Sequence, residues 1–398
     1  MGQTGHVSTG EHTRSVHPPA LPPLRQTPLA PPVHRSATFA FASAQECADV
    51  FAAPTSGYSY SRTDNPSVDA FALAAAALEG DGAAGQAFAS GTAAQTAVLL
   101  ALCASGSHVV VPRELYGGTY ALLVRQLARF GVIAEFVDQR DLDAVRAALR
   151  PQTTVLWAET IANPTLSVTD LPALAALAHE AGVPLVVDST FAPPPVCRPL
   201  EHGADLVVHS ATKYVGGHSD VTGGLVLGAP ELVGRVRQVR VDTGSSLGPD
   251  DAVLLQRGLA TLPLPVERQC ATALAVATAL EGHPGIARVA HPGLASHRDH
   301  ALAVRLFTPG RYGAVVTFTP RGGREAGFRL VDRLRLVARA TSLGGTVSKA
   351  VHVASTTHLA LSDEALRAAG IDPGAVRLSV GLEDPEDLVA DLLQALDD

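Results

Sequence analysis

The stretch His209-Ser210-Ala211-Thr212-Lys213-Tyr214-Val215-Gly216-Gly217-His218 decides the interpretation of this sequence, because it places Lys213 directly after an apolar strand, Leu206-Val207-Val208. The chain of 398 residues contains only two lysines, Lys213 and Lys349, and arginine supplies the other basic side chains. An amine can lose its proton and form a Schiff base, whereas a guanidinium cannot. A lysine at this position therefore indicates chemistry that arginine does not offer.

A carboxylate is expected at the same edge of the sheet as Lys213. A second apolar strand, Leu185-Val186-Val187, ends in Asp188. Ligands of open α/β sheets collect at the carboxyl ends of the strands. Pyridoxal phosphate (PLP) requires a lysine for its aldehyde and an acidic residue for its ring nitrogen. The pair predicts a PLP site, and a solvated loop lysine with a helix-capping aspartate is the simpler alternative.

Short apolar segments alternate with helical ones over residues 64–260. Strands are expected at 87–89, 109–111, 132–137, 155–157, 185–187, 206–208 and 224–227, and helices at 68–78, 93–103, 119–130, 141–149 and 171–181. This alternation predicts an α/β fold with a mostly parallel central sheet and helices on both faces. From 261 to 398 the order is mixed, with helices at 271–280 and 327–337 and strands at 314–318 and 376–380. A smaller C-terminal α+β domain is predicted there.

Residues 1–63 differ from both of these regions. The first 30 or so are polar and then rich in proline, without the period of a helix or a strand. The segment up to Arg62 contains little that could form a core. We therefore expect an extended N-terminal arm that packs on a second subunit.

The composition excludes several classes of protein. The formal net charge of −8 argues against nucleic acid as the main partner. No run of about 18 apolar residues is present, so no membrane span is expected, and the N-terminus lacks the pattern of a signal peptide. The four cysteines are scattered and form no CxxC pair, which is typical of a reduced, cytoplasmic protein: Cys47, Cys103, Cys197 and Cys270.

Three further motifs add to the predicted site. Ser90-Gly91-Thr92 opens a helix directly after a strand, where backbone N–H groups and hydroxyls can bind a phosphate, although an ordinary βα turn has the same pattern. Ser210 and Thr212 flank Lys213 and offer hydroxyls to the same phosphate. Tyr116 follows a strand and can stack on an aromatic ring. The guanidinium of Arg377 suits the α-carboxylate of an amino acid, or else it is a surface group on a strand.

Two other groups of residues suggest a different function, one a serine hydrolase and the other a metal site. Gly244-Ser245-Ser246-Leu247-Gly248 matches the GxSxG pattern of serine hydrolases, but an arginine-rich helical stretch precedes it instead of a strand. Four polar residues suggest a metal site: His202, Asp205, His209 and His218. Asp205 begins the strand that His209 ends, which sets them too far apart for one ion.

With these residues in place, the chain resembles the Cys/Met-metabolism PLP-dependent enzymes, which include cystathionine γ-lyase and γ-synthase, methionine γ-lyase and O-acetylhomoserine sulfhydrylase. The resemblance runs from about Thr13 to the C-terminus. Its motifs occur in this order: Tyr60-Ser61-Arg62 with Asn65-Pro66, Leu78-Glu79-Gly80, Ser90-Gly91, Tyr116-Gly117-Gly118-Thr119, Glu159-Thr160 with Asn163-Pro164, Asp188-Ser189-Thr190, Ser210-Ala211-Thr212-Lys213-Tyr214 with Gly217-His218-Ser219-Asp220, Arg257-Gly258-Leu259, Ser342-Leu343-Gly344-Gly345, and Arg377 to Asp384.

The resemblance implies the aspartate aminotransferase-like fold of type I PLP enzymes and a homotetramer of two dimers with shared active sites. A phosphate-binding set would combine the neighbour's Tyr60 and Arg62 with Gly91, Thr92, Ser210 and Thr212. Tyr116 would stack on the ring, Asp188 would keep the ring nitrogen protonated, and Asn163 would lie near the ring hydroxyl.

The resemblance also implies the chemistry. Lys213 would remove the Cα proton, Tyr116 would serve as general acid for the γ leaving group, and Arg377 with Ser342 would bind the substrate carboxylate. Thr341 stands where cystathionine-processing relatives carry glutamate, and Gly118 where methionine γ-lyases carry cysteine.

These departures favour γ-elimination from an L-amino acid with a small uncharged or halide leaving group, such as a methionine-like, homoserine-ester, halogenated or unsaturated substrate. Two alternatives stay open. One is γ-replacement on an activated homoserine ester by a sulfhydrylase or a cystathionine γ-synthase-like enzyme. The other is a catalytically inactive relative that serves as a binding or scaffold subunit.

Overall fold

The computed structural model describes residues 26–52, 57–359 and 362–396. Residues 33–398 form one compact unit, and both β-sheets lie within it. Most of the segment predicted as a tail, residues 1–25, lies outside the described residues. Within the described residues, no helix is long and apolar enough to cross a membrane.

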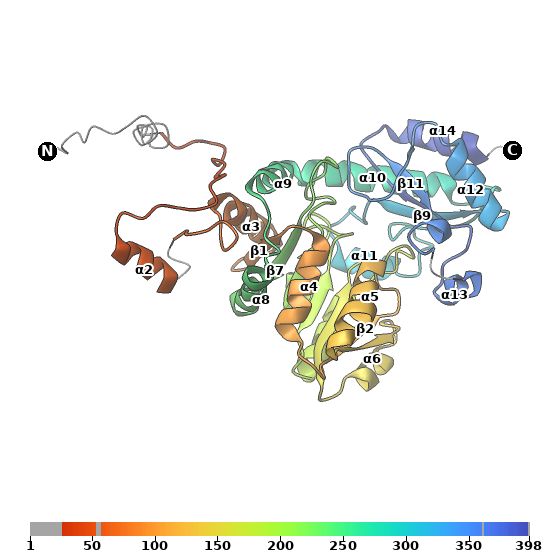
Figure 1. Ribbon diagram of the computed structural model, residues 1–398. Helices are drawn as coiled ribbons and strands as arrows, with labels where there is room; N and C mark the ends of the chain where they lie inside the picture. Colours follow the sequence, from red (N-terminus) through yellow and green to blue (C-terminus); the bar gives the residue numbers. More distant parts are fainter. Residues whose placement is uncertain (1–25, 53–56, 360–361, 397–398) are drawn as a thin grey trace. The chain divides into compact units, whose positions relative to one another are not determined.

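The first sheet has seven strands in the order β1-β7-β6-β5-β4-β2-β3 (Figure 1). Their bounds are β1 Ala84–Phe88, β2 His108–Pro112, β3 Ile133–Val137, β4 Thr153–Glu159, β5 Leu185–Asp188, β6 Leu206–His209 and β7 Gly224–Gly228. Strands β2 to β6 pair in parallel, and β7 pairs antiparallel with both β6 and β1. The predicted α/β class is confirmed, and the sheet is mixed at the β7 side.

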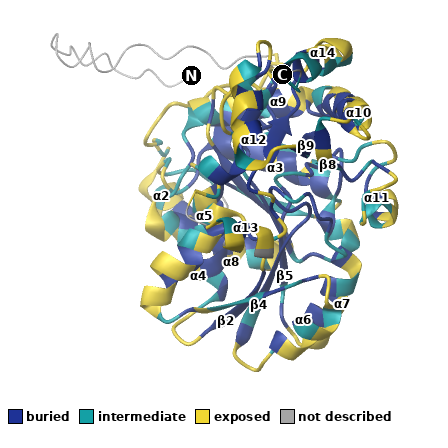
Figure 2. Ribbon diagram, turned by 90° about the vertical axis from the view of Figure 1, so that its right-hand side faces the viewer, coloured by how far each residue is buried: buried dark blue, intermediate teal, exposed yellow. Residues whose placement is uncertain are grey.

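Helices cover both faces of this sheet. They are α3 Pro66–Glu79, α4 Gly91–Leu102, α5 Gly117–Ala121, α6 Leu142–Ala148, α7 Leu171–Glu180, α8 Pro230–Thr243 and α9 Pro249–Thr261. Successive strand residues point into two separate cores: Val110, Leu156, Val187 and Val207 into one, and Val109, Val155, Val186 and Val208 into the other. Burial on both faces explains why the central positions of these strands are apolar (Figure 2).

Helix α4 has a polar start and an apolar body. The Ser90 side chain accepts a hydrogen bond from the Ala93 N–H and caps the helix. Leu99 and Val98 are fully buried in the core that α4 shares with α8. The chain therefore turns sharply at the end of β1 and points the first N–H groups of α4 along the carboxyl edge of the sheet.

The helix predicted for residues 119–130 is not one continuous α-helix. The segment consists of α5, a π-helical turn at Leu122–Gln126 and a 3-10 turn at Leu127–Phe130. The π turn adds a residue to the repeat, and Leu122, Leu123 and Leu127 are all buried as a result. In a regular α-helix Leu122 and Leu127, five residues apart, would lie about 140° apart around the axis, whereas both are buried here.

The second sheet has five strands in the order β10-β11-β12-β9-β8. Its strands are β8 Ile286–Ala290, β9 Val315–Pro320, β10 Ala338–Arg339, β11 Lys349–His352 and β12 Val376–Ser379, and its helices are α10 Pro263–Leu280, α11 His300–Leu306, α12 Gly323–Arg333, α13 Asp363–Ala368 and α14 Pro385–Leu396. The predicted boundary at 261 falls between α9 and α10. Because Val316 and Leu378 belong to the same core as Val187, the contacts do not separate the sheets, and the three-domain division stays a prediction.

Residues 34, 35 and 64, which precede α3, form polar contacts with α3, α9 and α8. Thr38 forms an isolated bridge with Tyr60, and helix α2, Ala44–Ala52, exposes Phe51 to 68%. Asp64 anchors the end of the segment before α3, because it forms ion pairs with Arg237 and Arg240 of α8. The Arg240 side chain is only 2% exposed, so this anchor is buried.

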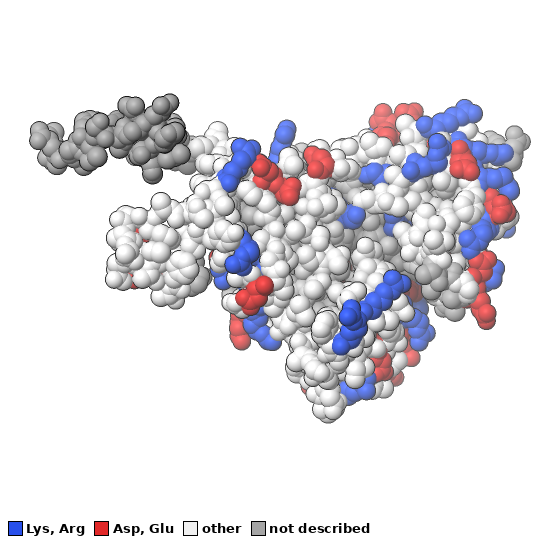
Figure 3. Space-filling view, in the orientation of Figure 1, with Lys and Arg blue, Asp and Glu red and all other residues white. Residues whose placement is uncertain are grey.

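Charged side chains of both signs are interspersed on the face shown in Figure 3. Arginine supplies almost all of the basic groups, as the sequence requires. On this face, acidic side chains do not form one continuous patch.

Candidate active site

A cavity of about 340 Å³ opens at the carboxyl ends of β4, β5 and β6, beside the start of α4. All of the predicted site residues except Tyr60 and Arg62 line it: Gly91, Thr92, Tyr116, Asn163, Asp188, Ser210, Thr212, Lys213, Thr341, Ser342 and Arg377. These residues come from seven separate segments of the chain. The structure therefore brings together groups that are almost 300 residues apart in sequence.

Lys213 lies in the turn that follows β6, and its Nζ donates to Ser342 Oγ at 2.7 Å. Burial, and then the positive charges of Arg377 and Lys349, lower the pKa of the Lys213 amine. A lowered pKa increases the share of neutral amine at a given pH. The neutral amine is the form that attacks an aldehyde or accepts a proton.

Asp188 ends β5 with its carboxylate almost fully buried. Its Oδ2 accepts from Gln95 Nε2 at 2.8 Å, and its Oδ1 accepts from the Thr190 N–H at 3.0 Å. Glu159 is its partner in the β4–β5 register and accepts from the Tyr116 N–H at 2.7 Å. Burial, and then the charge of Asp188, raise the pKa of Glu159 well above its usual value. Of these two carboxyl groups, Glu159 therefore favours the protonated form.

The turn at Ser90-Gly91-Thr92 faces the turn at Ser210. A Cβ on Gly91 would lie 2.7 Å from Ser210 Cβ, so the close approach of the two turns requires glycine. The first N–H groups of α4 have no partner inside the helix and attract negative charge. With the hydroxyls of Thr92 and Ser210 nearby, this arrangement fits a phosphate.

Arg377 reaches the cavity from β12 and is 4% exposed. Its Nη1 donates to Asn163 Oδ1 at 3.0 Å and its Nη2 donates to the Ser342 carbonyl at 3.1 Å. Its Nε is buried and has no hydrogen-bond partner among the described residues. These contacts orient the guanidinium and leave a donor for a ligand carboxylate. The Asn163 side chain, which was predicted to lie near the ring hydroxyl of PLP, thus accepts a hydrogen bond from Arg377.

Tyr116 begins α5 at the mouth of the cavity, with 44% of its surface exposed. Burial, and then the charges of Asp188 and Glu159, raise the pKa of its phenol. A Cβ on Gly118 would lie 2.4 Å from Tyr116 Cε1. Glycine at 118 therefore makes room for the tyrosine ring in this orientation.

Tyr60 and Arg62 do not line the cavity of their own chain. The Arg62 guanidinium lies 5.5 Å from the centroid of the Tyr60 ring, and its Nη1 donates to the Val241 carbonyl. Tyr60 is 44% exposed. Their predicted role at a neighbouring subunit's site stays a prediction.

The lining of the cavity fits PLP. A lysine amine, a buried carboxylate with two hydrogen-bond donors and a glycine-dependent helix N-terminus are the groups that an aldehyde, a pyridine nitrogen and a phosphate need. Arg377 provides a place for a substrate carboxylate in the same cavity.

Several lining residues were not predicted from the sequence: Gln95, Glu159, Thr190, Phe191 and Thr357. Gln95 follows Gly91 by four residues, which puts both on one side of α4. The four-residue spacing from Gly91 could have predicted that Gln95 lies near the site. Glu159 belongs to the Glu159-Thr160 motif of the family resemblance. Its position beside Asp188 depends on the β4–β5 register.

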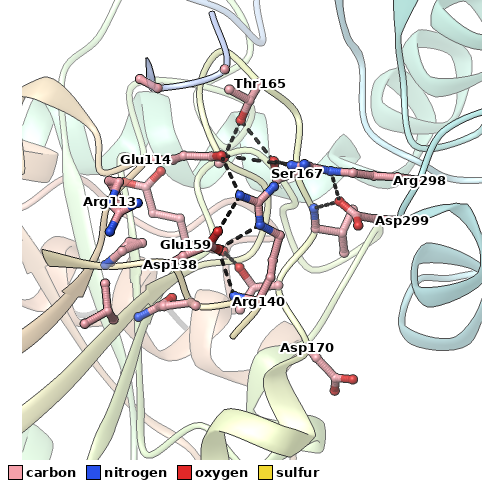
Figure 4. A pocket seen from close by; sticks show the side chains of 18 of the residues that line it. Arg113, Glu114, Asp138, Arg140, Glu159, Thr165, Ser167, Asp170, Arg298 and Asp299 are labelled. Atoms are coloured by element: carbon pink, nitrogen blue, oxygen red, sulfur yellow. Dashed lines mark hydrogen bonds and ion pairs between the residues drawn. The ribbon is translucent and has the colours of Figure 1, made fainter. Parts of the chain in front are cut away.

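A larger cavity of about 520 Å³ lies beyond Glu159 (Figure 4). Arg140 pairs with Asp138 there at 2.7 Å, and Arg298 lies 3.5 Å from Asp299. Among the described residues, its lining contains no lysine, cysteine or histidine. We therefore place the reactive site at the smaller cavity.

The competing motifs have structural explanations. Gly244 ends α8 and Ser246 Oγ donates to the Arg62 carbonyl at 2.6 Å, in a loop between two helices. His209 Nε2 lies 3.6 Å from Glu79, and Asp205 accepts from the Leu185 N–H. Among the described residues, no three histidine, cysteine or acidic side chains form a metal-binding group.

Lys349 was the other lysine that could form a Schiff base. It begins β11, and its Nζ donates to Ser219 Oγ at 2.9 Å. It does not line the cavity that contains Lys213.

Comparisons with known proteins agree with this site. A family model described as "Cys/Met metabolism PLP-dependent enzyme" matches residues 12–397. An L-methionine gamma-lyase of Pseudomonas putida is 43% identical over 97% of each chain. A cystathionine gamma-synthase of Mycobacterium tuberculosis is 40% identical over 99% of each chain.

A solved structure is also similar to this chain. It is described as a putative O-acetylhomoserine (thiol)-lyase from Campylobacter jejuni, and it contains a pyridoxyl-lysine phosphate. The TM-score is 0.90 at 31% sequence identity, with 97% of this chain and 99% of that chain covered.

Proposed function

Because the chain belongs to the Cys/Met metabolism PLP-dependent enzymes, we propose that it is a γ-lyase for L-amino acids with a small uncharged or halide γ substituent. The observation that carries the proposal is the lining of the cavity at Thr341. The two carboxyl groups in the described lining, Asp188 and Glu159, already accept hydrogen bonds from the protein. In this proposal Asp188 faces the ring nitrogen of PLP and Glu159 supports Tyr116, so neither is assigned to the distal ammonium of a substrate such as cystathionine.

Each of three lining residues, Lys213, Arg377 and Tyr116, has a separate role in the proposed reaction. PLP, when bound, supplies the electron sink for the charge left at Cα. Lys213 accepts the Cα proton, because burial favours its neutral amine. Arg377 binds the substrate carboxylate through the N–H donors that its contacts with Asn163 and Ser342 leave free, and these two contacts orient it. The Tyr116 phenol donates a proton to the leaving group, since its raised pKa keeps it protonated at neutral pH.

A second candidate, γ-replacement on an activated homoserine ester, has support from two comparisons. One relative is described as a cystathionine gamma-synthase and one similar structure as a putative O-acetylhomoserine (thiol)-lyase. Elimination and replacement use the same lysine, carboxylate and arginine, so only the fate of the product separates them.

A product panel tests the proposal. The purified enzyme is incubated with methionine, O-acetylhomoserine, γ-halogenated amino acids and cystathionine, each with and without a small thiol. We expect a 2-oxo acid and ammonia from the small substrates, with cystathionine turned over poorly. Thioether as the main product would establish replacement instead, and efficient cystathionine cleavage would contradict the argument from Thr341. An absence of bound cofactor and product would point to an inactive binding subunit.

We also propose a homotetramer of two dimers with shared active sites. Support comes from Tyr60 and Arg62, which lie outside the cavity of their own chain, and from the exposed apolar Phe51 of α2. A second subunit would cover α2 and receive the two side chains. All four cysteines lie in the described region and are unpaired, which supports a cytoplasmic location.

A further inference from the structure

Gln95 is a buried polar side chain in a helix whose other buried side chains are apolar. It is 3% exposed and lies one turn after Gly91 on α4. Burying an amide is unfavourable unless its polar atoms form hydrogen bonds. Its Nε2 donates to Asp188 Oδ2 at 2.8 Å, whereas its Oε1 is buried without a partner among the described residues. Gln95 therefore contacts the site through its amide N–H group and not through its amide oxygen.

A second acid lies beside the Asp188 carboxylate, and the two cationic groups of the cavity do not pair with it. Glu159 on β4 is adjacent in register, and it favours the protonated form because of burial and the nearby Asp188 charge. Tyr116 lies within electrostatic range of both acids. The cationic groups in the same cavity are Lys213 and Arg377, and neither forms an ion pair with Asp188. Two donors, Gln95 Nε2 and the Thr190 N–H, thus define the orientation of Asp188.

We propose that Gln95 is a positioning residue that holds the Asp188 carboxylate in the orientation that the ring nitrogen of PLP needs. The inference rests on the proposed site roles of Asp188 and Lys213. Because Gln95 and Gly91 lie on the same helix, α4 positions both ends of the cofactor. Its first turn meets the phosphate, and its second turn supports the partner of the ring nitrogen.

Gln95→Leu removes the amide and keeps a side chain of similar size. Hydrogen bonds to charged groups are among the stronger ones in proteins, so we expect PLP to dissociate about 10- to 100-fold more readily and kcat to fall by a similar factor. The substrate KM should change by less than about 3-fold, because Arg377 and Ser342 do not contact Gln95. Cofactor loss is followed by visible absorption during dialysis of the holoenzyme, with the fold checked by circular dichroism.

Gln139→Leu is a matched control. Gln139 is also buried, donates through Nε2 to the Trp157 carbonyl, and has a buried Oε1 without a partner among the described residues. It does not touch Asp188. We expect Gln139→Leu to lower stability as Gln95→Leu does but to leave PLP retention unchanged.

Gln95→Glu gives a pH signature that a merely structural role would not. At acidic pH the new carboxyl group is protonated and can donate to Asp188, whereas at alkaline pH two adjacent carboxylates repel each other. PLP retention and kcat of this variant should be closest to wild type near about pH 6 and fall steadily toward about pH 8.5, relative to the wild-type profile.

Two outcomes would overturn the inference. One is wild-type PLP retention and kcat in Gln95→Leu. The other is a Gln95→Glu profile that runs parallel to wild type at every pH, because loss without pH dependence would assign Gln95 to packing alone. A failure of the proposed function is distinguishable, since wild-type enzyme would then not give the expected 2-oxo acid from the small substrates, while PLP retention in the variants could still be measured.

Discussion

At the scale of single residues, Arg377 uses two of its five N–H donors in contacts that fix the guanidinium. Its Nη atoms hold the Asn163 side chain and the Ser342 carbonyl, and its buried Nε has no partner among the described residues. A lysine would keep the charge but could not fill the planar set of contacts. The function of Arg377 therefore depends on the shape of the guanidinium as well as on its charge.

Arg377→Lys is expected to raise the substrate KM by about 10- to 100-fold while changing kcat by less than about 5-fold, because the loss concerns carboxylate binding. Steady-state kinetics on the best substrate of the panel measure this. Arg288→Lys, on the exposed edge of β8, is the control and should behave as wild type. A main effect on kcat would mean that Arg377 acts in the chemical step.

The predicted site residues that line the cavity come together for a local reason. Asp188 and Lys213 follow strands directly, so knowing the strands was enough to bring them to one edge. Gln95 and Glu159 were missed because their roles depend on the rotation of α4 and on the β4–β5 register. Those are contacts between elements, and the sequence of neither element specifies them.

At the scale of elements, Asp64 connects the segment before α3 to α8. It pairs with Arg240 at 2.9 Å and with Arg237, in a largely buried setting. Removing one partner of a buried pair leaves a charge without compensation, at a cost of about 3–5 kcal/mol. An exposed pair contributes about 0–1 kcal/mol.

Asp64→Asn is therefore expected to lower the free energy of unfolding by about 3 kcal/mol. Asp250→Asn, which breaks the exposed pair with Arg35, should change it by less than about 1 kcal/mol. Urea unfolding of both variants at one protein concentration makes the comparison. Equal effects would show that Arg240 finds other partners, of which Gln86 and the Thr63 carbonyl are the nearest.

The elements themselves were largely predictable, and their pairing was not. The apolar strands and the capped helix after Asn65 follow from local sequence. The antiparallel position of β7 between β1 and β6 depends on contacts between residues far apart in the chain, such as Phe88 with Gly224. The break after α5 arises because Leu122, Leu123 and Leu127 are all buried in the same core.

At the scale of the whole molecule, the proposed shared site makes a prediction about mixed assemblies. Two inactive chains are coexpressed, one with Lys213→Ala and the other with Tyr60→Ala and Arg62→Ala. If each site takes its lysine from one chain and Tyr60 with Arg62 from its neighbour, half of the dimers are mixed and each has one intact site. Activity should then recover to about a quarter of wild type, since pairing is random within symmetric dimers.

Separately purified variants mixed without exchange of subunits are the control and should remain inactive. Chains carrying all three substitutions, coexpressed with the Lys213→Ala chain, should also show no recovery. If the first mixture fails to recover while the mixed assemblies form, the two arm residues do not serve a neighbouring site.

The presence of two lysine side chains in 398 residues has a practical consequence for measuring the state of the enzyme. Lys349 lies outside the cavity beside Ser219, whereas Lys213 lies within it. An amine-acylating reagent should reach Lys349 whether or not the cofactor is present, and Lys213 only in molecules that have lost it. Mass spectrometry of the peptides that contain the two lysines would then give the fraction of vacant sites, with Lys349 as the internal standard.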